Sequence, residues 1–120
     1  MAGGAVKVAG IGCRAGAPVT VLTEMLAQAE ALAGPVDAVA TIAPRAAEIT
    51  ALNRPLRIVA IAGIDTPTQS PRIQSLHGTG SVAEAAALAA CGPGARLILN
   101  RIASPCGRAT IAIAIREETP

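Results

Sequence analysis

Two glycine-containing segments hold the residues best suited to chemistry in this chain. The first, Gly10-Ile11-Gly12-Cys13-Arg14-Ala15-Gly16, follows a short apolar run and precedes a helical pattern. Glycines let backbone N–H groups approach an anion, a helix N-terminus favours negative charge, and Arg14 adds a charged fork. We therefore expect a loop here, with Gly10, Gly12, Cys13 and Arg14 binding a ligand.

The spacing of these glycines leaves other interpretations open. It is G-x-G-x-x-x-G rather than the G-x-G-x-x-G of dinucleotide-binding folds, and Asp37 is only loosely placed to contact a ribose. A tight turn without a ligand would use the same glycines. We favour an anion site for another ligand, with phosphate or a nucleotide as the alternative.

The second segment, Gly78-Thr79-Gly80-Ser81, repeats this arrangement before another helical pattern, and we expect all four residues to bind the ligand. Ser81 and Glu84 have the spacing of a capping box, so Glu84 is expected to cap the helix, with a general base as the alternative. His77 is the only histidine and the one side chain that ordinarily titrates near neutrality. It is either a solvated loop residue or a proton donor that contacts the ligand.

Three further residues extend the predicted site. Arg45 and Glu48 lie three apart on one helical face, where pairing with each other at the surface is the simpler interpretation. Arg101 follows a predicted strand, where a pocket wall and a solvated hairpin end are equally compatible. Cys13 could have a lowered pKa beside Arg14, but the chain has no second histidine to build a catalytic pair with it.

Composition narrows the class of protein. Hydrophobic residues make up 52% of the 120 residues and charged residues 15%, which predicts one folded domain over residues 1–120. With no aromatic residue and a net charge of +2, nucleic acid is not an expected partner. Nine of the ten basic residues are arginines, which suit carboxylate recognition, although coding bias would give the same count.

The cysteines and the apolar runs indicate in which cellular compartment the protein is expected. Three cysteines without CxxC spacing fit neither a disulfide framework nor a zinc site, which indicates a reducing cytoplasm. No apolar run approaches the roughly 20 residues of a membrane span. We expect no metal, no cofactor and no membrane contact.

The elements that must position these residues alternate along the first half of the chain. Apolar strands are expected at 5–9, 37–42 and 56–62, with helices from Pro18 to about residue 33 and over 44–52, so the sheet should be mainly parallel. Residues 63–80 are rich in breakers and predict a long binding loop. A helix over 82–91 and a hairpin of strands 96–99 and 109–115 should follow.

Four blocks together resemble the CobE/CbiG C-terminal family in order and spacing over nearly the whole chain. They are GIGCR from Gly10, Arg45-x-x-Glu48, GTGSVAEAAAL from Gly78, and ATIAIA from Ala109. The resemblance implies an α/β fold of three layers, α/β/α, with a mixed, mainly parallel sheet of about five strands. Where the family usually has lysines, this chain has Arg45 and, near the second position, Arg101, so the charge is kept but the amine is not.

The resemblance also implies a role in building the corrin ring of cobalamin, with a carboxylate-rich, precorrin-type tetrapyrrole as the ligand. A chain of this length is similar to the stand-alone members, which are associated with the aerobic pathway. Three hypotheses stay open: a binder of such an intermediate, an enzyme using His77, Glu84 or Cys13 as acid or base, and a non-catalytic assembly partner of another cobalamin-biosynthesis enzyme.

Overall fold

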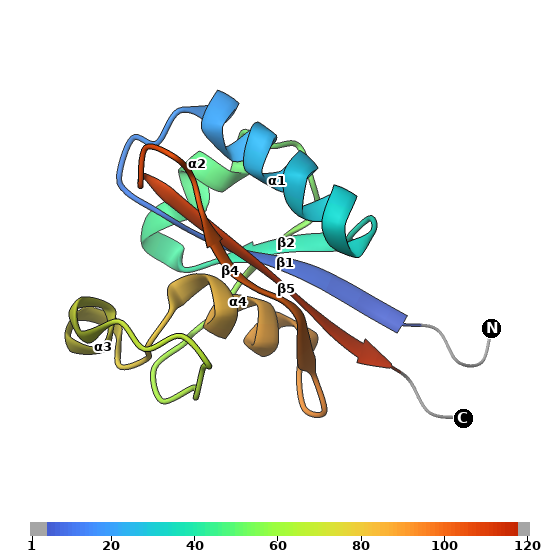
Figure 1. Ribbon diagram of the computed structural model, residues 1–120, viewed down its shortest axis with the longest axis vertical. Helices are drawn as coiled ribbons and strands as arrows, with labels where there is room; N and C mark the ends of the chain where they lie inside the picture. The colour runs from blue at the N-terminus through green and yellow to red at the C-terminus, as the bar shows by residue number, and fades with distance from the viewer. Residues whose placement is uncertain (1–4, 118–120) are drawn as a thin grey trace.

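The computed structural model describes residues 5–117, which form a mixed β-sheet and the helices packed on it (Figure 1). Residues 1–4 and 118–120 of the domain expected over 1–120 lie outside this range. In chain order the elements are β1 (Ala5–Cys13), α1 (Val19–Ala33), β2 (Ala38–Thr41), the 3₁₀ helix η1 (Ala43–Arg45), α2 (Ala46–Thr50), β3 (Leu56–Ile58), α3 (Pro71–His77), α4 (Val82–Cys91), β4 (Arg96–Ala103) and β5 (Ala109–Glu117).

The five strands lie in the order β3-β2-β1-β5-β4. The pairs β1–β2 and β2–β3 are parallel, whereas β1–β5 and β5–β4 are antiparallel. Four strands therefore point in one direction and only β5 opposes them, which confirms the expected mixed sheet. The final hairpin supplies the antiparallel half because its short connection can join only antiparallel neighbours.

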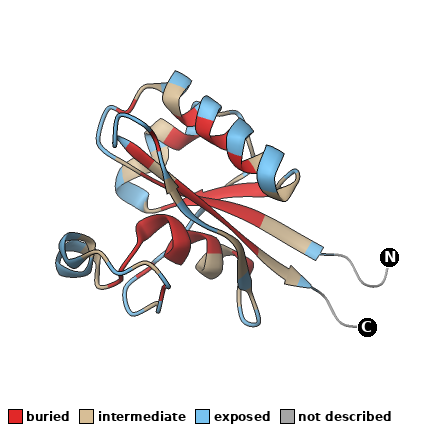
Figure 2. Cartoon of the chain, in the orientation of Figure 1, coloured by how far each residue is buried: buried red, intermediate tan, exposed pale blue. Residues whose placement is uncertain are grey.

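Helices cover both faces of the sheet and produce three layers (Figures 1 and 2). On one face, α1 and α2 pack against alternate residues of β1 and β5. On the other, α4 packs against the intervening residues. The first core contains Ile11, Leu22, Met25, Ile49, Ile111 and Ile113, and the second contains Val8, Ala85, Ala86, Ala87, Cys91 and Ala114.

Gly10 marks the closest approach of α4 to the sheet. A Cβ atom added there would lie 2.0 Å from the carbonyl oxygen of Ala83 and 2.5 Å from the amide nitrogen of Ala87. The prediction that Gly10 lies in a loop is wrong. Gly10 and Gly12 lie inside β1, which continues to Cys13, and Gly10 is small because the helix backbone packs directly on it.

From residue 56 onward the chain differs from its expected elements in three places. Residues 63–80 are not one long loop, because they contain α3. Strand β3 is shorter than expected and ends at Ile58. Strand β4 extends to Ala103, with irregular pairing on β5 between Leu97 and Ile102. These irregularities turn the backbone near Arg101 away from a regular ladder.

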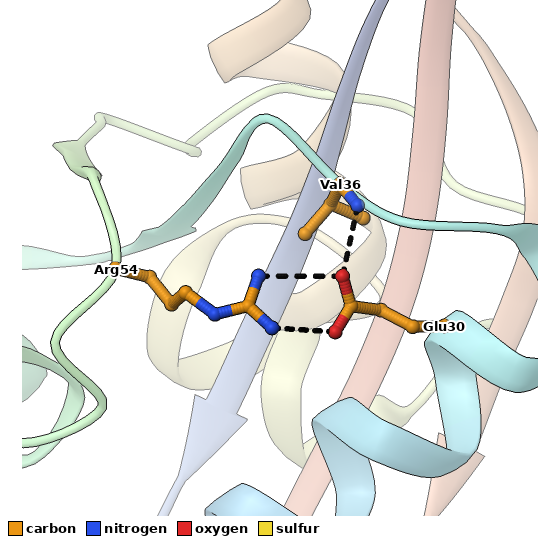
Figure 3. A network of polar contacts seen from close by, with 3 residues as sticks. All are labelled: Glu30, Val36 and Arg54. Carbon is orange, nitrogen blue, oxygen red and sulfur yellow. Dashed lines mark hydrogen bonds and ion pairs between the residues drawn. The ribbon is translucent and has the colours of Figure 1, made fainter.

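An ion pair links the C-terminal half of α1 to the segment before β3 (Figure 3). Arg54 Nη2 lies 2.6 Å from Glu30 Oε1, and the Val36 amide donates to Glu30 Oε2 at 2.9 Å. The hydrogen bond from Arg54 and that from Val36 lower the pKa of the Glu30 carboxyl against the opposing effect of burial.

Within the described range, no helix is long and apolar enough to cross a bilayer.

Candidate functional site

A cleft of about 600 Å³ lies where β1 and β4 end and β5 begins. Ligands of open α/β sheets bind beyond the carboxyl ends of the strands, which is where this cleft lies relative to β1, β2 and β4. Five arginines line it and no aspartate or glutamate does, so its lining is strongly cationic. The five are Arg14, Arg45, Arg72, Arg101 and Arg108.

Backbone hydrogen bonds bring the first and last of these arginines together. The Arg14 amide, directly after β1, donates to the Arg108 carbonyl at 2.9 Å. The Arg108 amide in turn donates to Ser104 Oγ at 3.1 Å, which fixes the β4–β5 turn. Both arginine side chains are exposed. The two ion pairs among residues 5–117, Arg54–Glu30 and Arg96–Glu117, lie outside the cleft.

The turn after β1 is fastened by Arg45 and Glu48. Arg45 Nε donates to the Cys13 carbonyl at 3.0 Å, and the Gly16 amide donates to Glu48 Oε2 at 2.8 Å. The bond from Gly16 lowers the pKa of the Glu48 carboxyl. The interpretation that Arg45 and Glu48 pair with each other at the surface is wrong, because each reaches the β1–α1 turn instead. Arg45 lines the cleft, whereas Glu48 lies outside the lining and holds the turn through its hydrogen bond from Gly16.

The second glycine segment connects α3 to α4. Gly78 ends α3 with φ at 71°, and its amide donates to the Gln74 carbonyl at 3.0 Å. Thr79 is buried and donates its hydroxyl to the Ile64 carbonyl. A Cβ on Gly80 would lie 2.2 Å from the Thr68 carbonyl oxygen, so the backbones touch there. Gly80 and Ser81 line the cleft, whereas Gly78 and Thr79 hold the connection in place.

Glu84 is a buried carboxylate that joins three segments. Its side chain accepts hydrogen bonds from the amide and the hydroxyl of Thr68 and from the amide of Arg101, each at 2.9 Å. Ser81 Oγ accepts from the Glu84 amide at 3.3 Å, so the predicted cap on α4 is confirmed from the serine side. The reciprocal bond expected of the Glu84 carboxylate is not made, because that carboxylate holds Thr68 and Arg101. Glu84 does not line the cleft.

Helix α3 adds cleft residues that the sequence did not indicate. Arg72, Ile73 and Leu76 line the cleft together with the expected His77. Ser70 caps this helix by accepting from the Ile73 amide at 3.4 Å. A serine-proline pair followed by Gly78 was the available signal for a short helix with these caps.

Cys13 lines the cleft without an activated thiol. Burial, and then the nearby Glu48 carboxylate, raise the pKa of Cys13 against the effect of Arg45. The suggestion of a lowered Cys13 pKa is therefore wrong, since desolvation outweighs the neighbouring cation. Within the described chain, no group of three or more His, Cys, Asp or Glu side chains lies close enough to hold a metal ion.

The structure thus brings most of the predicted site together. The expected residues that line the cleft are Gly12, Cys13, Arg14, Arg45, His77, Gly80, Ser81 and Arg101. Those that lie outside it are Gly10, Glu48, Gly78, Thr79 and Glu84. The arginines that sequence reasoning missed are Arg72, inside the supposed loop, and Arg108, after the hairpin turn. Ligand contact by the cleft residues stays a prediction.

The fold and cleft define a three-layer α/β/α protein with a cationic site at the strand ends. Residues 7–114 match the family described as "Cobalamin synthesis G C-terminus". The chain belongs to this family, which places it among the proteins of cobalamin biosynthesis.

Two solved structures resemble the chain closely. The crystal structure of CobE, a protein from the cobalamin (vitamin B12) biosynthetic pathway, has a TM-score of 0.74 and 30% identity, covering 92% of this chain and 90% of that one. The cobalamin biosynthesis protein chiG from Agrobacterium tumefaciens str. C58 has a TM-score of 0.64 and 39% identity, with 91% and 97% covered. No curated protein sequence matches significantly.

Proposed function

We propose that the chain binds a carboxylate-rich, precorrin-type intermediate of cobalamin biosynthesis in the cleft, as one cytoplasmic domain acting in the aerobic pathway. The observation that carries this proposal is the convergence of five arginines on a cleft whose lining includes no acidic side chain. Like charges brought together repel one another, so a multiply charged anion is the ligand that relieves them.

The geometry of arginine suits acetate and propionate groups. Each guanidinium can donate two parallel hydrogen bonds to one carboxylate, and the five come from different elements around the cleft. The first amides of α4, at Val82 and Ala83, have no partner within the helix and add positive potential next to Ser81. Ile42 and Val82 supply aliphatic wall between the charges.

The test is a titration with uroporphyrin III, a tetrapyrrole with eight carboxylates, followed by absorbance and intrinsic porphyrin fluorescence. Arg14→Gln and Arg101→Gln should each raise Kd about tenfold, because a charge-assisted hydrogen bond is worth roughly 1.5–3 kcal/mol before solvent screening. Added NaCl should weaken binding of the wild type. The matched control is Arg96→Gln, an exposed arginine of β4 outside the cleft.

Two results would contradict the proposal. One is the lack of saturable binding at micromolar protein, and the other is an equal loss of affinity in Arg96→Gln. Displacement of the porphyrin by ADP or inorganic phosphate at lower concentration than by coproporphyrin would instead favour the phosphate or nucleotide alternative. Co-purification with another cobalamin-biosynthesis enzyme, without porphyrin binding, would select the assembly-partner hypothesis.

A further inference from the structure

Helix α3 carries an apolar surface that the fold does not use. None of its residues is buried, and Leu76 is 60% exposed although leucine is among the residues most often buried in proteins. Ile73 alone packs against the second core as a partly buried residue. An exposed leucine on a helix without buried residues adds little to folding, so its surface is available for something else.

The exposed apolar surface faces the cleft. Arg72, Ile73, Leu76 and His77 all line it, and their spacing of three and four residues puts them on one side of the helix. The other cleft arginines, Arg14, Arg45, Arg101 and Arg108, come from strand ends and from the segments that follow them. Four of the five cleft arginines therefore lie at or just after the strand ends, whereas α3 contributes Arg72 together with an aliphatic edge formed by Ile73 and Leu76.

The helix is attached mainly at its ends. At its start, the Ser70 amide donates to the Gly80 carbonyl at 3.0 Å. At its end, the Gly63 amide donates to the Gly78 carbonyl at 2.9 Å. Between these points the helix stands away from the sheet, beside the start of α4 (Figure 1). Figure 2 shows it as a largely exposed element. Leu76 can therefore contact a ligand without leaving a core, whereas Ile73 keeps its contact with the second core.

We infer that α3 is the wall against which the apolar ring of the ligand rests, while carboxylates on the rim of that ring reach the strand-end arginines. The site then selects anions that carry such a ring over small anions without one. Leu76 is the specificity-determining residue for the ring. This inference rests on the proposed function and adds the orientation of the ligand and the residue that reads its ring.

The experiment compares Leu76→Ser with Leu32→Ser in titrations of uroporphyrin III and coproporphyrin III. Leu32 is a matched control because it is 65% exposed on α1 and lies outside the cleft. Covering the exposed part of a leucine is worth about a five- to twentyfold change in Kd. Leu76→Ser should weaken both porphyrins by that factor, because they share the ring, and Leu32→Ser should leave both unchanged. Amide hydrogen exchange of residues 71–77 should slow when either porphyrin binds.

Three results would overturn the ring wall alone, and a fourth would overturn the proposed function as well. Equal Kd values for Leu76→Ser and the wild type, or an equal loss in Leu32→Ser, overturn the ring wall while arginine-dependent binding still supports the proposed function. Unchanged exchange over residues 71–77 in the porphyrin-bound protein overturns it as well. If the wild type binds neither porphyrin, the proposed function fails, and the ring wall fails with it.

Discussion

Replacing Glu84 with glutamine tests whether this buried carboxylate holds the cleft together. Oε1 accepts from the Thr68 amide, and Oε2 accepts from the Thr68 hydroxyl and the Arg101 amide. Glutamine turns one of these oxygens into an NH₂ group, so one backbone donor loses its acceptor whichever way the amide is placed. The Thr68 hydroxyl can rotate to accept, but an amide N–H cannot.

The expected cost follows from these contacts. A buried donor left unpaired costs about 1–3 kcal/mol, and the remaining bonds lose their charge assistance, for roughly 1 kcal/mol more. Glu84→Gln should therefore lower the free energy of unfolding by about 2–4 kcal/mol in urea titrations at pH 7. Ser81→Ala, which removes only the cap, should cost about 1 kcal/mol.

The matched control is Glu24→Gln, an exposed glutamate of α1, which should change stability by less than about 0.5 kcal/mol. Because Glu84 fixes the backbone of Arg101, Glu84→Gln should also weaken porphyrin binding by the folded protein. A loss of stability no larger than that of Glu24→Gln would refute the reasoning, since the three bonds would then contribute nothing.

Two further predictions concern packing and pH. Gly10→Ala should lower the free energy of unfolding by at least about 3 kcal/mol in urea titrations, because its Cβ would meet the backbone of α4. Gly16→Ala should cost about 1–2 kcal/mol, because Gly16 has φ at 74° but open space around it. Equal costs for the two variants would contradict the close packing of α4 on Gly10. Glu30→Gln should be less stable than the wild type at pH 7. Because the pKa of Glu30 in the folded protein lies below its ordinary 4.5, this difference in unfolding free energy should persist above pH 4.5 and disappear as pH falls through the lowered pKa. A difference that is unchanged at pH 3 would contradict the ion pair.

The sequence predicted the sheet better than it predicted the binding surface. Apolar runs located β1, β2 and α4, which are buried along much of their length, and helical spacing located α1, which buries one face. The capping spacing of Ser81 and Glu84 placed the start of α4 correctly. What the pattern cannot report is contact between segments distant in the chain, such as the use of the Glu84 carboxylate by Thr68 and Arg101.

The two main errors have different physical causes. Glycine is common in turns, which favours a loop at Gly10, but the residue is needed here for the approach of a helix 73 residues later, at Ala83. Helix α3 buries no residue, so it shows no apolar periodicity from which it could be predicted. The prediction therefore lacks Arg72, whereas Arg14, Arg45 and Arg101, which it includes, all line the cleft.

The position of β5 between β1 and β4 has a consequence for how the protein acquires its site during synthesis. Strand β1 is made first, yet one of its two sheet neighbours is made last, so the ribosome must release the final hairpin before the sheet can close. Pairing strands so far apart in sequence is slow, because a long chain must be ordered before the contact forms. A nascent chain halted after α4 would hold Arg14, Arg45 and Arg72 but neither Arg101 nor Arg108, and would therefore lack two of the five arginines that line the cleft.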